Sequence, residues 1–206
     1  MKNNIKVIIF DLGGVLVPEK RDLMDNHISR FLKIKEGDLK RFSKNLNNEL
    51  TKGEIDLSQF YSGILKKINN KEISPSKLVQ KHIALYKKYC IKRDASVLRL
   101  IRRLKKRYLV VCLVNTELEI AKINKENGLY NIFLKSFIST EMKMMKPSLN
   151  IYKMVLRRLR IKSEKAVFID DKEKNVNSAR KLGINSILYK NFRQLKKDLK
   201  TFGLSI

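Results

Sequence analysis

The chain has 206 residues, of which 43% are hydrophobic, enough to bury the core of one globular domain with a modest insertion. Its 46 basic residues outnumber its 20 acidic residues and give a formal net charge of +26, which favours anionic partners such as phosphorylated metabolites, nucleic acid or acidic surfaces. Its two cysteines are too few for a disulfide framework, and no apolar run reaches the length of a membrane span. Only six residues precede the first predicted strand, which leaves no room for a secretory signal. We therefore expect a cytoplasmic protein without a membrane segment.

The first predicted element is a buried strand that runs into a tight turn. Residues 7–10 are consecutive apolar residues, and Asp11 and the pair Gly13-Gly14 follow them, as at the end of a parallel strand. In an open α/β sheet, ligands bind beyond the carboxyl ends of the strands. Asp11 therefore stands either at a functional site or, alternatively, only as a cap of the turn.

A helical insertion is predicted after this strand, over residues 18–89. Apolar residues recur there at helical spacing, for example at Phe60, Ile64 and Ile68, and no strand-like alternation interrupts them. We predict a small α-helical bundle, with residues 1–17 and 90–206 forming the core domain. The bundle is either a lid over the ligand site or a passive structural insertion.

Beyond the insertion, strands alternate with helices. We expect strands at residues 108–114, 134–139, 166–169 and 185–189, and helices at residues 95–107, after residue 116, at 149–160, from residue 172 towards 183 and in a basic tail. This alternation predicts an α/β fold: a Rossmann-like parallel sheet covered by helices, with right-handed crossovers.

The ends of three predicted helices carry local signals. Thr116 and Glu119 have the spacing of a capping box, which gives Thr116 a structural explanation and no catalytic role. Pro147 and Ser148 are expected to open a helix, and Gly183 is expected to end one.

Polar side chains follow the predicted strands at one edge of the sheet. They are Asp11, Asn115, Lys146, Asp170 and Asp171. Carboxylates brought close together repel one another and require a cation, and their hard oxygen ligands suit Mg²⁺. Asp170 and Asp171 alone could cap the following helix, but together with Asp11 they predict a Mg²⁺ site.

Four segments, in this order, resemble the motifs of the haloacid dehalogenase-like (HAD) hydrolases. They are FDLGGVLV at residues 10–17, LVNT at 113–116, MKPSLNIY at 145–152 and FIDDKEKNVNSARKLG at 168–183. The GEI stretch at residues 53–55 also resembles the helical cap of the phosphatase-like members.

The resemblance implies a nucleophile and a metal site. Asp11 would attack phosphorus and form an aspartyl-phosphate intermediate. Mg²⁺ would lie between Asp11, the main-chain carbonyl of Gly13 and Asp171, with Asp170 nearby or behind them.

The resemblance also implies two groups that bind the phosphoryl group. Lys146 would neutralise the Asp11 carboxylate and a phosphoryl oxygen together, and the main-chain N–H of Asn115 would help to hold the phosphoryl group. The alternative for Lys146 is a solvated lysine at a helix start, although a cation is unfavourable at a helix N-terminus.

Two positions depart from the family pattern. Gly13 stands where the family usually has a second Asp, the general acid, although some phosphatase-like relatives also carry Asp-Leu-Gly. Val114 stands where a Ser or Thr hydroxyl usually donates to the phosphoryl oxygen, and valine has nothing to donate.

Two functions are therefore considered. The first is a Mg²⁺-dependent phosphatase of a small phosphorylated metabolite, and dehalogenation is less favoured because paired aspartates suit phosphoryl chemistry. The second is a catalytically weakened relative that binds an anionic ligand or a macromolecule, which Gly13, Val114 and the net charge of +26 favour.

Much of the positive charge lies in two clusters at predicted helix ends. They comprise Arg99, Arg102, Arg103, Lys105, Lys106 and Arg107, and Arg157, Arg158, Arg160 and Lys162. These helices precede strands, so the clusters should lie at the edge of the sheet opposite the crevice. They either complement helix dipoles or make non-specific contact with polyanions.

Overall fold

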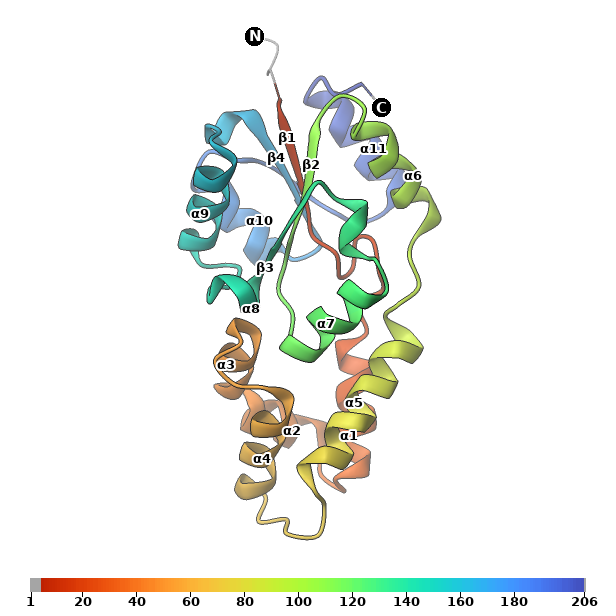
Figure 1. The fold of residues 1–206 in the computed structure, drawn as a ribbon, viewed down its shortest axis with the longest axis vertical. Helices are drawn as coiled ribbons and strands as arrows, with labels where there is room; N and C mark the ends of the chain where they lie inside the picture. The colour runs from red at the N-terminus through yellow and green to blue at the C-terminus, as the bar shows by residue number, and fades with distance from the viewer. Residues whose placement is uncertain (1–4, 206) are drawn as a thin grey trace.

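A five-stranded parallel sheet lies at the centre of the computed structural model, which describes residues 5–205 (Figure 1). The strand order is β3-β2-β1-β4-β5. The strands are β1 (Val7–Phe10), β2 (Leu109–Val114), β3 (Lys135–Ile138), β4 (Ala166–Asp170) and β5 (Asn185–Leu188). The parallel α/β fold predicted from the sequence is confirmed. Residues 1–4 of the predicted core domain, and residue 206, lie outside the described residues.

Strand β1 lies between β2 and β4, and this position organises the site. Its four residues are all buried, because a parallel sheet is covered on both faces and its central strands are apolar throughout. The residues that follow β1, β2 and β4 therefore leave the sheet side by side at its carboxyl edge.

Helices cover both faces of the sheet. Ile8 and Phe10 point into one apolar layer with α6 (Ala95–Leu104) and α11 (Phe192–Thr201). Val7 and Ile9 point into the other layer, with α9 (Leu149–Leu159) and α10 (Glu173–Arg180). The connections also contain α7 (Leu118–Glu126), α8 (Ser139–Met142) and the 3₁₀ turns η1 (Tyr130–Ile132) and η2 (Ser163–Lys165).

A helical bundle is inserted between β1 and α6. Its members are α1 (Arg21–Phe31), α2 (Glu36–Ser43), α3 (Leu46–Lys52), α4 (Leu57–Lys67) and α5 (Pro75–Tyr89). The bundle has its own apolar core, which includes Ile28, Leu57, Ile64 and Leu78. Figure 1 shows it beyond the carboxyl edge of the sheet, facing the ends of β1, β2 and β3. Between residues 5 and 205, no helix is both long and apolar enough to cross a membrane.

The predicted capping box is wrong. Helix α7 starts at Leu118 with Glu117 as its N-cap, and no side chain bonds to that cap. The N–H of Thr116 instead donates to Ser139 Oγ (3.0 Å), and Glu119 Oε1 accepts from the N–H of Leu57 in the bundle (3.0 Å). Tertiary partners from β3–α8 and α4 therefore replace the local cap.

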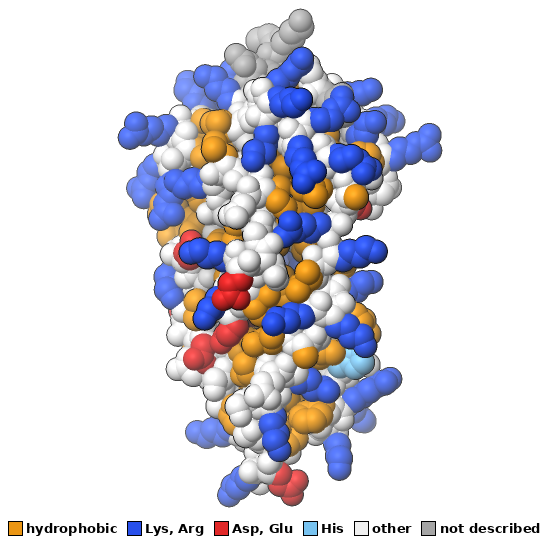
Figure 2. All heavy atoms as spheres, turned by 45° about the vertical axis from the view of Figure 1, so that its right-hand side comes forward, with side chains coloured by type: hydrophobic (Ala, Val, Ile, Leu, Met, Phe, Trp, Pro, Cys, Tyr) orange, Lys and Arg blue, Asp and Glu red, His pale blue; other side chains and the backbone are white. Residues whose placement is uncertain are grey.

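The basic clusters lie in the C-terminal parts of α6 and α9 and in the loops that follow, which lead to the amino ends of β2 and β4. Figure 2 shows Lys and Arg side chains crowded at that end of the molecule, away from the bundle. This is the edge of the sheet opposite the carboxyl ends of the strands, as the order of the elements predicted.

Candidate active site

The centre of the site is a buried ammonium between two buried carboxylates. Lys146 Nζ lies 2.8 Å from Asp11 Oδ1 and 2.7 Å from Asp170 Oδ2. Asp11 directly follows β1 and Asp170 ends β4, so the pairing of these neighbouring strands places the two carboxylates together. Lys146 comes from the loop before α9 and its side chain is buried, so the alternative of a solvated lysine at a helix start is wrong.

The protonation of Lys146 and that of Asp11 affect each other. Burial opposes the charge of Lys146, but the carboxylates of Asp11 and Asp170 outweigh it and raise the pKa of the ammonium, which stays protonated. Burial raises the pKa of the Asp11 carboxyl to about 7, against the opposing effect of Lys146. A further cation beside Asp11 would favour its ionised form.

Asp170 has its oxygens occupied by donors. Besides Lys146, its Oδ1 accepts from the N–H of Lys172 (2.8 Å) and from Nδ2 of Asn175 on α10 (2.9 Å). Sequence analysis missed Asn175, although its position five residues after Asp170, in the helix that leaves β4, places it near that carboxylate. These donors make Asp170 a support for Lys146 more than a free ligand.

Asp171, by contrast, keeps an oxygen available. Its Oδ1 is buried and, within residues 5–205, accepts no hydrogen bond. One carboxylate oxygen each from Asp11, Asp170 and Asp171 lies within 4.8 Å of the others. Gly14 permits this approach: its φ is +74°, and a Cβ there would overlap the Asp171 carboxylate. An uncommitted carboxylate oxygen in an all-oxygen cluster fits a hard divalent cation such as Mg²⁺.

Asn115 fixes the main chain of Lys146. Its Oδ1 accepts from the N–H of Lys146 (2.9 Å), and its Nδ2 donates to the Lys146 carbonyl (2.9 Å). The two bonds tie the exit of β2 to the loop that carries the lysine. The structure thus brings the predicted site residues together: Gly13, Asn115 and Lys146 line one hollow with Asp11, and Asp170 and Asp171 form the carboxylate cluster with Asp11.

A family model for "haloacid dehalogenase-like hydrolase" matches residues 5–183. The chain belongs to this family. The HAD hydrolase is also similar to solved HAD structures over nearly all of its length. It is 28% identical to a HAD family enzyme, bt-2542, from Bacteroides thetaiotaomicron, with a TM-score of 0.75 over 91% of this chain and 94% of that chain.

Two further comparisons extend this result. The wild-type Bacteroides enzyme in complex with magnesium and inorganic phosphate is 26% identical, with a TM-score of 0.70 over 90% of the HAD hydrolase and 94% of that chain. A predicted HAD-like family hydrolase from Porphyromonas gingivalis shares the fold at 23% identity, with a TM-score of 0.75 over 96% and 98% of the two chains.

A curated relative matches only a segment. Drimenol cyclase drtB from Aspergillus calidoustus is 36% identical over 70 residues, which are 34% of the HAD hydrolase but 13% of the cyclase. The chain therefore spans a small part of the length of that relative.

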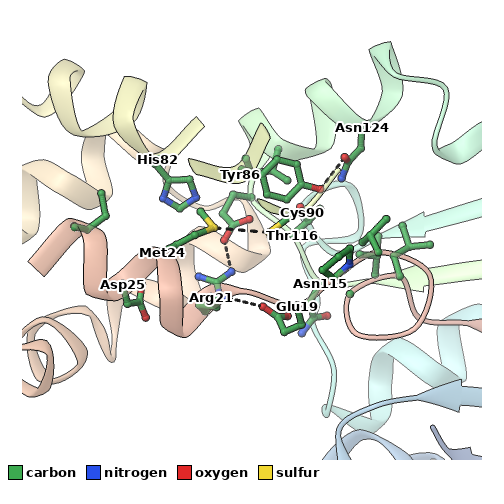
Figure 3. A pocket seen from close by; sticks show the side chains of 18 residues that line it. Glu19, Arg21, Met24, Asp25, His82, Tyr86, Cys90, Asn115, Thr116 and Asn124 are labelled. Atoms are coloured by element: carbon green, nitrogen blue, oxygen red, sulfur yellow. Dashed lines mark hydrogen bonds and ion pairs between the residues drawn. The ribbon is translucent and has the colours of Figure 1, made fainter. Parts of the chain in front are cut away.

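Two hollows meet at the site of the HAD hydrolase. The first, which we call the crevice, has a volume of about 280 Å³ and is lined by Asp11 and Lys146 and, from α3, by Asn47, Asn48 and Thr51. The second, the bundle cavity, has a volume of about 80 Å³ and lies between bundle and sheet (Figure 3). Its apolar lining comes from Leu12, Val17, Pro18, Met24, Ile28, Tyr86, Cys90, Val114 and Ile120.

Several polar contacts hold the bundle over the sheet, among them those of Arg21, Thr51 and Leu57. Arg21 Nη2 lies 2.5 Å from Glu117 Oε1, and this guanidinium outweighs the effect of burial and lowers the pKa of Glu117 to about 2. Ser139 Oγ donates to the Thr51 carbonyl (2.6 Å), and Glu119 accepts from Leu57 as described above. Since Arg21 and Thr51 also line the crevice, the bundle forms part of the wall of the site.

Proposed function

We propose that the chain is a Mg²⁺-dependent phosphatase of a small phosphorylated metabolite, acting through an aspartyl-phosphate on Asp11. The observation that carries this proposal is the centre in which Lys146 holds Asp11 and Asp170 while Asp171 keeps a buried oxygen without a hydrogen-bond partner. The complex of the 26% identical Bacteroides enzyme with magnesium and inorganic phosphate supports it.

In this proposal Asp11 attacks phosphorus, and the bond from phosphorus to the ester oxygen breaks. Mg²⁺, held by Asp11, the Gly13 carbonyl and Asp171, would offset the repulsion between the anionic nucleophile and the anionic substrate. Lys146 is placed to orient Asp11 and to stabilise the charge that develops on the phosphoryl oxygens. Water then hydrolyses the aspartyl-phosphate.

The main-chain N–H of Asn115 completes the proposed phosphoryl site. The Asn115 side chain, by its two bonds to Lys146, keeps that part of the chain in place. Asp170 supports the site from behind, through Lys146 and Asn175.

In the proposed division into domains, residues 18–89 form a cap, and residues 1–17 and 90–206 form the hydrolase core. The substrate would bind between the two. The bundle cavity adjoins the crevice and would receive the leaving group. Its volume of about 80 Å³ limits the part of the leaving group that it can hold, and the rest would lie in the adjoining crevice of about 280 Å³. This size favours a small alcohol with an apolar body.

A phosphatase panel with and without Mg²⁺ tests the proposal, with Asp11→Asn as the inactive control. We expect Mg²⁺-dependent release of phosphate that Asp11→Asn abolishes. Calorimetry should show weaker Mg²⁺ binding in Asp171→Ala than in Asp170→Ala, because Asp171 carries the uncommitted oxygen. If no substrate releases phosphate and Mg²⁺ does not bind, the alternative of an anion-binding relative takes the place of the phosphatase.

A further inference from the structure

The carboxylate of Glu19 occupies the space beside Gly13, where the family's usual second Asp would begin. A Cβ on residue 13 would lie 3.2 Å from Glu19 Oε2. The backbone does not require glycine there, because Gly13, unlike Gly14, is outside the positive-φ region. Glycine at position 13 therefore leaves room for the side chain of Glu19.

Two contacts hold Glu19 in this place. Its Oε1 accepts from the N–H of Arg21 (3.1 Å), which fixes the carboxylate at the start of α1. Its Oε2 lies 3.2 Å from Lys172 Nζ, on the loop that leaves β4. The Glu19 side chain is 36% exposed, so water reaches its carboxylate.

Glu19 also lies at the junction of the two hollows. Only a few residues line both the crevice and the bundle cavity: Gly13, Glu19, Arg21 and Asn115. Figure 3 shows Glu19 near Arg21 and Asn115 in the lining of the bundle cavity. A leaving group that extends from a phosphoryl group at Asp11 into the bundle cavity must pass this carboxylate.

We propose that Glu19 is the general acid that replaces the missing Asp at position 13; this inference rests on the proposed phosphatase function. While an Asp11 oxygen forms its bond to phosphorus, the bond from phosphorus to the ester oxygen breaks. The Glu19 carboxyl gives its proton to that oxygen, and the product leaves as an alcohol.

The same carboxylate serves the second half of the reaction. Glu19, now ionised, takes a proton from the water that attacks the aspartyl-phosphate, so that inorganic phosphate leaves, Asp11 is regenerated and Glu19 is protonated again. Lys172 also lines the crevice, so a phosphoryl group bound there would compete with Glu19 for the Lys172 ammonium and free the Glu19 oxygen for this exchange.

The test compares two substrates with similar rings. The 4-nitrophenolate of 4-nitrophenyl phosphate departs without a proton, whereas the alkoxide of benzyl phosphate needs one. We measure kcat/KM, which reports the steps up to departure of the leaving group. Glu19→Gln should lower kcat/KM for benzyl phosphate by about 10²–10⁴-fold and for 4-nitrophenyl phosphate by less than about tenfold.

Two further variants make the test specific. Glu173 is an exposed glutamate in the first turn of α10, and Glu173→Gln should change kcat/KM for neither substrate. Glu19→Ala combined with Gly13→Asp should recover benzyl phosphate hydrolysis relative to Glu19→Ala, because the new carboxyl occupies the vacated space.

The outcomes separate this inference from the function on which it rests. If wild type hydrolyses 4-nitrophenyl phosphate but Glu19→Gln affects both substrates equally or neither, Glu19 is not the acid and the phosphatase stands. If wild type hydrolyses neither substrate with Mg²⁺, both the phosphatase and its acid are wrong.

Discussion

Replacing Lys146 by methionine keeps the length of the side chain but removes the positive charge between Asp11 and Asp170. The three side chains are 1%, 9% and 0% exposed, so water cannot take the place of the ammonium. Breaking a buried ion pair and leaving its partner uncompensated costs about 3–5 kcal/mol. At about 2–4 °C per kcal/mol for a chain of this size, the melting temperature of Lys146→Met should fall by roughly 6–20 °C without metal.

Thermal unfolding of Lys146→Met with and without Mg²⁺ measures this effect. Mg²⁺ should restore part of the loss, because a divalent cation at the same carboxylates also reduces their repulsion. Lys174→Met, which replaces an exposed lysine of the same crevice, is the matched control and should stay within about 0.5 kcal/mol of wild type. An unchanged melting temperature in Lys146→Met would refute the reasoning that this lysine neutralises a buried pair of carboxylates.

Three other predictions concern separate parts of the molecule. Val114→Ser restores a hydroxyl at the end of β2 and should raise kcat by up to about 10²-fold for both leaving groups; steady-state kinetics in which the two respond differently would contradict it. Burial lowers the pKa of His82, which is bonded to Tyr61, to about 4, below its value of about 6.5 in the unfolded chain. The unfolded chain therefore binds the proton first as the pH falls, so about 3 kcal/mol of stability present above pH 6.5 should be lost by pH 4. Denaturant unfolding should show that His82→Gln loses less stability than wild type between pH 6.5 and pH 4. An equal loss of stability in the two proteins would exclude His82 as its cause. Charge reversal at Arg102, Arg103, Lys105 and Lys106 should weaken heparin binding, which should itself decline steeply with salt; salt-independent binding would argue against a polyanion contact at these helix ends.

The residues at the strand exits could be found from the sequence because topology alone brings them together. Once β1 is placed between β2 and β4, Asp11 must lie beside Asp170, and Asn115 must lie on the other side. The periodic apolar runs and the cluster of carboxylates therefore sufficed to predict the sheet and the centre of the site.

The contacts that complete the site could not be found in this way. Glu19 lies in an irregular segment without periodicity, and its neighbour Lys172 is 153 residues away in the sequence. The capping box at Thr116 failed for a related reason: Ser139 competed for the N–H of Thr116, and the bundle competed for Glu119. Local patterns do not contain these long-range partners.

The phosphoryl-enzyme itself tests the central claim most directly. Wild type and Asp11→Asn are mixed with 4-nitrophenyl phosphate and Mg²⁺, the reactions are quenched in acid, and the peptides are mapped by mass spectrometry. We expect a phosphorylated peptide in wild type with the phosphoryl group on Asp11, dependent on Mg²⁺ and absent from Asp11→Asn. Mg²⁺-dependent turnover without phosphorylated Asp11, or phosphorylation that persists in Asp11→Asn, would contradict Asp11 as the nucleophile.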